Sequence, residues 1–68
     1  MTLKLTVNGR IVELEREMTI TEFLRMKGLP DALVAVEHNE RWLRREEWHA
    51  VTLKESDHLE VIRMIAGG

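Results

Sequence analysis

The chain has 68 residues, which suffices for one small domain with a single hydrophobic core and excludes a second. Hydrophobic residues make up 44% of it, a fraction that excludes a disordered chain. Its 10 basic and 12 acidic residues give a net charge of −2, which argues against nucleic acid or an anionic membrane as the main partner. Cysteine is absent, so disulfides, thiolate metal sites and a cysteine nucleophile are excluded, and any sulfur chemistry must proceed without a side-chain thiol.

The N-terminal residues alternate between apolar and polar types and contain no apolar block of signal-peptide length. No stretch approaches the roughly 18 apolar residues of a membrane span. We therefore expect a soluble, cytoplasmic protein.

Residues 2–7 place every apolar side chain on one face of an extended chain, which predicts a half-buried strand. Asn8 and Gly9 form the dipeptide that best tolerates the positive φ angles of a type I′ turn. A return strand over 10–14 completes a predicted N-terminal β-hairpin.

A short helix is predicted over 20–27. Thr19 and Glu22 have the spacing of a capping box at its start. Gly28 supplies a left-handed residue after its end, and Pro30 prevents continuation. A helix this short requires packing on a sheet for stability.

The apolar run at 33–36 predicts a strand covered on both faces. The next predicted elements are a turn at 38–41, an edge strand beginning at Trp42 and a helical turn over 44–48. This helical turn places the second tryptophan, Trp48, against the rest of the protein. Both tryptophans are interpreted as core or edge packing. The last strand is predicted over 58–65.

The predicted order is β-β-α-β-(β)-β, an α+β fold in which one main helix packs across a mixed sheet. Residues 1–65 form the single domain. Residues 66–68 form a flexible tail.

The terminal Gly67 and Gly68 are the candidate functional residues. Glycine lacks a Cβ atom, so a glycine tail can pass through a narrow channel in another protein. The α-carboxylate of Gly68 is ionised at pH 7 and becomes electrophilic only when activated, for example as a mixed anhydride with AMP. The alternative is a frayed tail without a function.

Other candidate residues are weaker. The spacings of His38, His49 and His58 match no metal motif, so we expect exposed turn and strand-end histidines and no metal site. The only serine, Ser56, stands next to Asp57 in a turn, and no nucleophile–base arrangement supports a catalytic residue.

The last strand carries more apolar residues than one face requires. Leu59 and Val61 share the core face, whereas Ile62, Met64 and Ile65 continue the apolar run toward the tail. Apolar residues beside a mobile tail predict a surface that docks a partner. The alternative is that a neighbouring element covers them.

Several segments, in order and spacing, resemble the ThiS family of thiamine-biosynthesis sulfur carriers. They are the Val7-Asn8-Gly9 hairpin, the capped helix, VAVEHN at 34–39, REEW at 45–48, LKESDHLEVI at 53–62, and Gly67-Gly68. The resemblance covers essentially the whole chain and implies the β-grasp fold of ubiquitin.

The resemblance also implies partners. An E1-like activating enzyme of the ThiF type would use ATP to adenylate the carboxylate of Gly68. A cysteine desulfurase or a rhodanese-type donor would then supply sulfur for a thiocarboxylate, and a thiazole synthase of the ThiG type would receive it. Ala66 and Gly67 would form the tail, and the chain would be a co-substrate that binds no cofactor itself rather than an enzyme.

Five positions depart from the family pattern. Glycine is usual or frequent where this chain has Glu40, Ser56 and Ala66, proline is common in place of Arg44, and phenylalanine in place of Met64. The departures bear on partner specificity more than on the carrier role, because the terminal diglycine is retained.

Several alternatives stay open. One is a MoaD-like carrier for molybdopterin or for another sulfur metabolite, and a second is a ubiquitin-like modifier that joins Gly68 to lysines. A third is an interaction domain whose tail is irrelevant, and a fourth, disfavoured by the charge, is a small RNA-binding domain.

Overall fold

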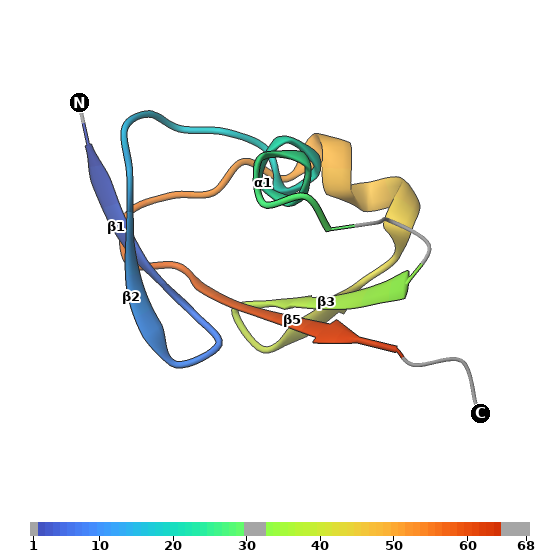
Figure 1. Ribbon diagram of the computed structural model, residues 1–68. Coiled ribbons are helices and arrows are strands. Elements are labelled where there is room, and N and C mark those ends of the chain that lie inside the picture. Colours follow the sequence, from blue (N-terminus) through green and yellow to red (C-terminus); the bar gives the residue numbers. More distant parts are fainter. Residues whose placement is uncertain (1, 30–32, 65–68) are drawn as a thin grey trace.

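The structure, a computed structural model, describes residues 2–29 and 33–64 (Figure 1). Its elements are β1 (Leu3–Val7), β2 (Arg10–Leu14), α1 (Ile20–Met26), β3 (Val34–His38), β4 (Arg41–Leu43), the 3-10 helix η2 (Arg45–Ala50) and β5 (His58–Arg63). The predicted order of elements is therefore confirmed for this part of the chain.

The strands form one mixed sheet in the order β2-β1-β5-β3-β4. The β1–β2 pair is antiparallel, β5 runs parallel to β1, and β3 is antiparallel to both β4 and β5. Helix α1 lies over one face of the sheet (Figure 1). The mixed sheet with one helix across it is the α+β arrangement predicted. The structure adds the strand order, in which the last strand of the sequence is the central strand of the sheet.

The start of α1 is fixed by the predicted capping box. The Glu22 amide donates to Thr19 Oγ1 at 3.1 Å, and the Thr19 amide donates to Glu22 Oε1 at 2.8 Å. This second bond, from the Thr19 backbone, is the main reason why the pKa of Glu22 lies below its ordinary value. At the other end Gly28 has a φ of +71°, as expected for the left-handed residue after a helix. Within residues 2–29 and 33–64, no helix is long and apolar enough to span a membrane.

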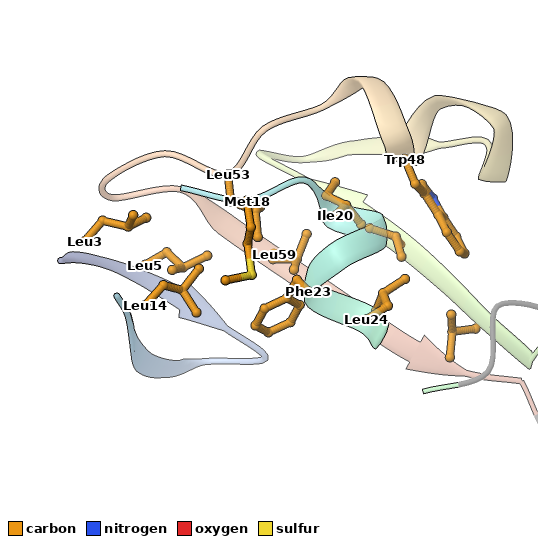
Figure 2. Close-up of a cluster of buried hydrophobic side chains, with 12 residues drawn as sticks. Leu3, Leu5, Leu14, Met18, Ile20, Phe23, Leu24, Trp48, Leu53 and Leu59 are labelled. Atoms are coloured by element: carbon orange, nitrogen blue, oxygen red, sulfur yellow. The ribbon is translucent and has the colours of Figure 1, made fainter. Parts of the chain in front are cut away.

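The core lies between α1, η2 and the covered face of the sheet (Figure 2). Its buried side chains are Leu3, Leu5, Leu14, Met18, Ile20, Phe23, Leu24, Val34, Val36, Trp48, Leu53 and Leu59. Trp48 is 2% exposed, so the prediction that the turn over 44–48 plants a tryptophan in the core is confirmed. Burial of large apolar side chains such as Phe23 and Leu24 stabilises the fold by about 1.5–3 kcal/mol each.

The prediction of a strand covered on both faces is wrong. Val34 and Val36 are buried, whereas Ala35 is half-buried and Leu33 is 43% exposed. The physical reason is that α1 and η2 pack on each other over the same face of the sheet. An apolar run shows that a strand is buried but not how many of its faces are covered. The last strand also ends at Arg63, and Ile65 lies outside the described residues.

Two hairpins use the same two-residue turn with different residues. Asn8 and Gly9 have φ angles of 52° and 81°, and Asn39 and Glu40 have φ angles of 50° and 70°. Two successive positive φ angles define a type I′ turn, which favours Asn-Gly. Glu40 therefore occupies a conformation that suits glycine.

The turn before β5 also places a residue other than glycine at a positive φ angle. The Asp57 amide donates to the Lys54 carbonyl oxygen, and Ser56, at the third position of the turn, has a φ of 70°. A positive φ at this position is the feature of a type II turn, which favours glycine. Glu40 and Ser56, two of the positions that depart from the family pattern, are thus both left-handed.

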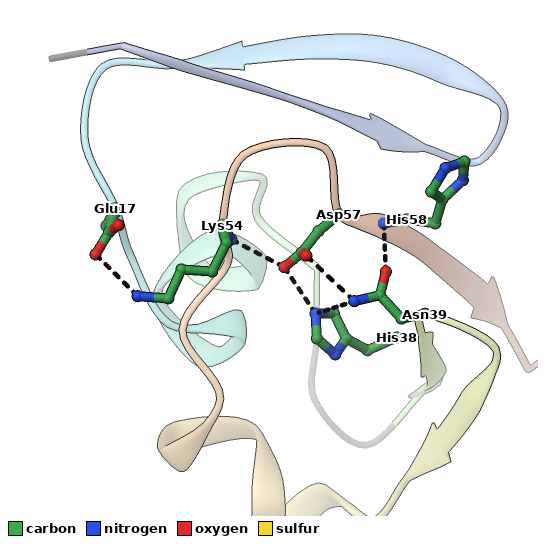
Figure 3. A network of polar contacts seen from close by, with 6 residues as sticks. All are labelled: Glu17, His38, Asn39, Lys54, Asp57 and His58. Carbon is green, nitrogen blue, oxygen red and sulfur yellow. Dashed lines mark hydrogen bonds and ion pairs between the residues drawn. The ribbon is translucent and has the colours of Figure 1, made fainter.

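A polar network around Asp57 joins this turn to the β3–β4 turn (Figure 3). Asp57 Oδ2 accepts from the Lys54 amide at 2.8 Å and lies 2.8 Å from His38 Nε2, while Oδ1 accepts from Asn39 Nδ2 at 3.2 Å. The Asn39 side chain in turn accepts from the His58 amide at 2.8 Å. Burial by itself would raise the pKa of Asp57, but the hydrogen bonds from His38, Lys54 and Asn39 outweigh it and hold the pKa below its ordinary value.

We expect the substitutions Glu40→Gly and Ser56→Gly each to raise the free energy of unfolding by about 1 kcal/mol, because glycine adopts positive φ without a steric penalty. Denaturant unfolding measures the change. Gly9→Ala in the other type I′ turn is the matched control and should lower the free energy of unfolding. A fall in stability for both glycine variants would contradict the explanation.

The charge of Asp57 should make folding sensitive to acid. Because its pKa is lower in the folded chain than in the unfolded one, the stabilisation is complete above the ordinary value of 3.8 and is lost as the pH falls through the folded value. We expect Asp57→Asn to lower the free energy of unfolding at pH 7 by about 1–3 kcal/mol and to flatten its decline below pH ~5. Unfolding curves across this pH range test this, with Glu60→Gln on the adjacent strand β5 as a control. An acid decline as steep in Asp57→Asn as in the wild type would refute it.

Candidate functional site

The candidate site is the end of β5, which carries the chain toward its C-terminus. Figure 1 shows β5 leading away from the β1–β2 hairpin. The strand ends at Arg63, and the Met64 amide still donates to the Leu33 carbonyl oxygen at 2.7 Å. The predicted tail residues Ala66, Gly67 and Gly68 and the predicted docking residue Ile65 lie outside the described residues, so their roles stay predictions.

One edge of β5 is paired by a side chain rather than by a strand. Strand β1 pairs with β5 at Leu59 and then turns away at Asn8. The Asn8 side chain continues the pairing, since its Oδ1 accepts from the Val61 amide at 2.8 Å and its Nδ2 donates to the Val61 carbonyl oxygen at 3.3 Å. Beyond Val61, the described chain pairs with β5 through β3 alone. The tail therefore leaves from a strand that is held on one side.

The face of the sheet opposite α1 carries an apolar and acidic surface beside this end. The strand register places Ile62 opposite Ala35, Glu60 opposite Glu37, and Glu37 opposite Trp42. Side chains that pair across strands share a face. We call these five residues the outer-face patch. Its largest side chains are well exposed, with Trp42 at 56% and Ile62 at 46%.

Two of the three predicted docking residues are exposed as a docking role requires. Ile62 and Met64 are 46% and 49% exposed, and the third, Ile65, lies outside the described residues. Sequence reasoning did not single out Trp42 as a contact residue. Trp42 lies on the edge strand β4 with its side chain exposed. A hairpin with its turn at 38–41 pairs Trp42 with Glu37, and this pairing could have placed Trp42 on the outer face from the sequence.

The three histidines do not form a site. His49 and His58 are exposed, as expected, but the same expectation is wrong for His38, whose side chain is 18% exposed because it meets Asp57. Among the residues that the structure describes, no group of three or more side chains has the arrangement of a metal site.

The two carboxylates whose pKa values are lowered, Glu22 and Asp57, have structural rather than catalytic surroundings. Glu22 caps α1, and Asp57 binds the Lys54 amide and the Asn39 side chain in addition to His38. Catalytic acids and bases are recognised by perturbed pKa values together with access to a reacting group. The described residues of this site offer surfaces for contact, and the role of the terminal carboxylate as the reactive group stays a prediction from the sequence.

Comparison with known proteins agrees with this geometry. The model of the ThiS family matches residues 5–68. The chain is 31% identical to the sulfur carrier protein ThiS of Bacillus subtilis over 65 residues, which cover 94% of this chain and 98% of that protein. It is also 35% identical, over 97% of its length, to a thiazole synthase of Magnetococcus marinus, but it spans only 20% of that protein.

Solved structures show the same fold. The crystal structure of the thiamine biosynthesis protein ThiS from Geobacter metallireducens superposes with a TM-score of 0.83 at 33% identity, and the match covers 97% of this chain and 100% of that one. The solution structure from the same organism gives a TM-score of 0.79 at 35% identity, covering 97% and 88% of the two chains. The predicted β-grasp fold is confirmed. The chain therefore belongs to the ThiS family, the family of the Bacillus subtilis sulfur carrier and of the Geobacter metallireducens thiamine biosynthesis protein.

Proposed function

We propose that the chain is a sulfur carrier that holds sulfur as a thiocarboxylate on Gly68 and donates it to thiazole formation in thiamine biosynthesis. The observation that carries the proposal is the family match, which runs through residue 68 and so includes the terminal diglycine. The absence of cysteine supports it, because a chain without thiols can hold transferable sulfur at its own C-terminus.

The proposed chemistry takes place in partner enzymes. An E1-like activating enzyme joins the Gly68 carboxylate to AMP, with pyrophosphate leaving ATP. The terminal sulfur of a persulfide on the sulfur donor attacks the acyl carbon, and AMP leaves. A second thiol then cleaves the acyl disulfide, which leaves the thiocarboxylate on the chain and a disulfide on the donor side. The chain is a co-substrate in each step.

Thiazole synthase is the proposed acceptor of the sulfur. The Magnetococcus marinus relative is a thiazole synthase, and one fifth of it matches this chain. This favours delivery to thiazole formation over delivery to molybdopterin. The outer-face patch, beside the end of β5, is the proposed surface that the activating enzyme contacts while the tail reaches into that enzyme's site.

Incubation with the activating enzyme, ATP and a persulfide donor should raise the intact mass of the chain by the difference between one sulfur and one oxygen atom. Deletion of Gly68 should abolish the increase and leave the melting temperature unchanged, since a terminal residue adds few contacts. Mass spectrometry measures the product, and omission of ATP is the control. An unchanged mass with enzymes that load a known ThiS protein would contradict the proposal.

The substitution Ile62→Asp should weaken binding of the chain to the activating enzyme about tenfold or more, because it buries a charge in the contact. Ile11→Asp is the matched control. Ile11 is 76% exposed and lies opposite Thr6, on the same face of the sheet but at its other edge. Calorimetry gives both affinities, and circular dichroism verifies the fold of each variant. Equal losses for the two variants would exclude the outer-face patch as the contact.

A further inference from the structure

A groove opens on the α1 side of the sheet, between the β1–β2 hairpin, α1 and the end of β5. Its volume is about 400 Å³. Phe23, which is 1% exposed, lies at its base, and the half-buried Val12, Leu29 and Val61 line it. Small-ligand and side-chain pockets commonly fall in this range of volume and are mostly apolar. The groove is therefore large enough for an apolar side chain of another molecule.

Three cationic side chains line the same groove. Arg10 comes from β2, Lys27 follows the last turn of α1, and Arg63 ends β5. The Lys27 ammonium lies 5.9 Å from the centroid of the Phe23 ring, directly over the apolar base. The described residues that line the groove include no aspartate or glutamate, and none of the three cations forms an ion pair with another described residue. In a chain with a net charge of −2, this is a local surface of opposite sign.

The groove lies beside the point where the chain leaves the sheet. Arg63 pairs with the buried Val34, so its side chain points to the α1 side, whereas Ile62 points to the other face. The last residue of β5 thus contributes to the groove, and its neighbour contributes to the outer-face patch. A protein that takes hold of the tail has the groove within immediate reach.

We propose that this groove receives an apolar side chain flanked by carboxylates, presented by the thiazole synthase to which the chain delivers its sulfur. The inference rests on the proposed function and adds the surface of contact. Charge complementarity determines the chemistry of the occupant, since the apolar base requires an apolar group and the three cations require anions around it. The Magnetococcus marinus thiazole synthase, which has a stretch similar to this chain within one polypeptide, favours this partner.

Calorimetric titration of the full chain into thiazole synthase tests the inference. We expect Lys27→Glu to weaken binding at least tenfold, and Lys27→Gln to weaken it less. Arg25→Glu is the matched control, because it makes the same change of charge in the last turn of the same helix but is not part of the groove. It should stay within twofold of the wild type. The substitutions at Lys27 and Arg25 both leave the sequence of the tail unchanged.

Salt gives a second readout. Added salt should weaken wild-type binding more than binding of Lys27→Glu, since the variant has lost one of the screened attractions. The inference would be overturned if Lys27→Glu bound thiazole synthase as tightly as the wild type does. It would also be overturned if Lys27→Glu and Arg25→Glu lost the same amount of affinity. A further titration adds octanoate to the wild-type chain and follows the amide resonances of Lys27 and Val61. If these resonances shift while Lys27→Glu binds the enzyme as tightly as the wild type, the groove holds a small amphipathic anion and the inference is overturned.

The two proposals can fail separately. If the wild-type chain does not bind thiazole synthase, the groove inference fails, and the mass increase at Gly68 still reports on the carrier chemistry. If the chain binds the enzyme but the Lys27 variants bind equally well, only the groove inference fails.

Discussion

The buried carboxylate of Asp57 fixes where the central strand begins. The hydrogen bonds of this carboxylate reach the β3–β4 turn through His38 and Asn39. The backbone carbonyl oxygen of Asp57 accepts from the Thr6 amide of β1 at 2.9 Å. The start of β5 is thereby tied to both neighbouring strands. A slip of one residue would move Leu59 from the core to the opposite face, so this anchoring also determines which side chains of β5 are buried.

The two ends of β5 are consequently held in different ways. At its start the strand has partners on both sides, and at Val61 the Asn8 side chain provides the last hydrogen bonds that join the described part of β5 to the hairpin. Beyond that point the described chain pairs with β3 alone. The strand that leads toward Gly68, the residue proposed to carry the reacting group, is thus firmly placed as far as Arg63. Positioning a reacting group is the contribution that a carrier makes to a reaction catalysed by other proteins.

Local patterns account for the parts of the structure that the sequence predicted. The Asn8-Gly9 hairpin and the Thr19–Glu22 cap depend on residues close in sequence. Trp48 was the only apolar residue in the polar segment 44–48, which made it the candidate for burial there. Strand order, the burial of His38 and the groove depend on contacts between distant segments, such as the contact of His38 with Asp57, 19 positions further along the chain. No periodicity within one segment specifies these pairings. The exposed Trp42 was missed for the same reason, because its face is set by pairing with another strand.

The turn network also explains how the chain tolerates residues that are poorly suited to their backbone conformation. Glu40 and Ser56 both have φ angles of 70°, which costs an L-amino acid about 1 kcal/mol relative to glycine. Each stands next to a member of the Asp57 network, Asn39 in one turn and Asp57 itself in the other. A backbone conformation that glycine would adopt freely is imposed here by side-chain hydrogen bonds from a neighbouring residue. The network therefore has two effects. It sets the register of the strand that leads toward the C-terminus, and it permits sequence change in the turns on which that strand depends.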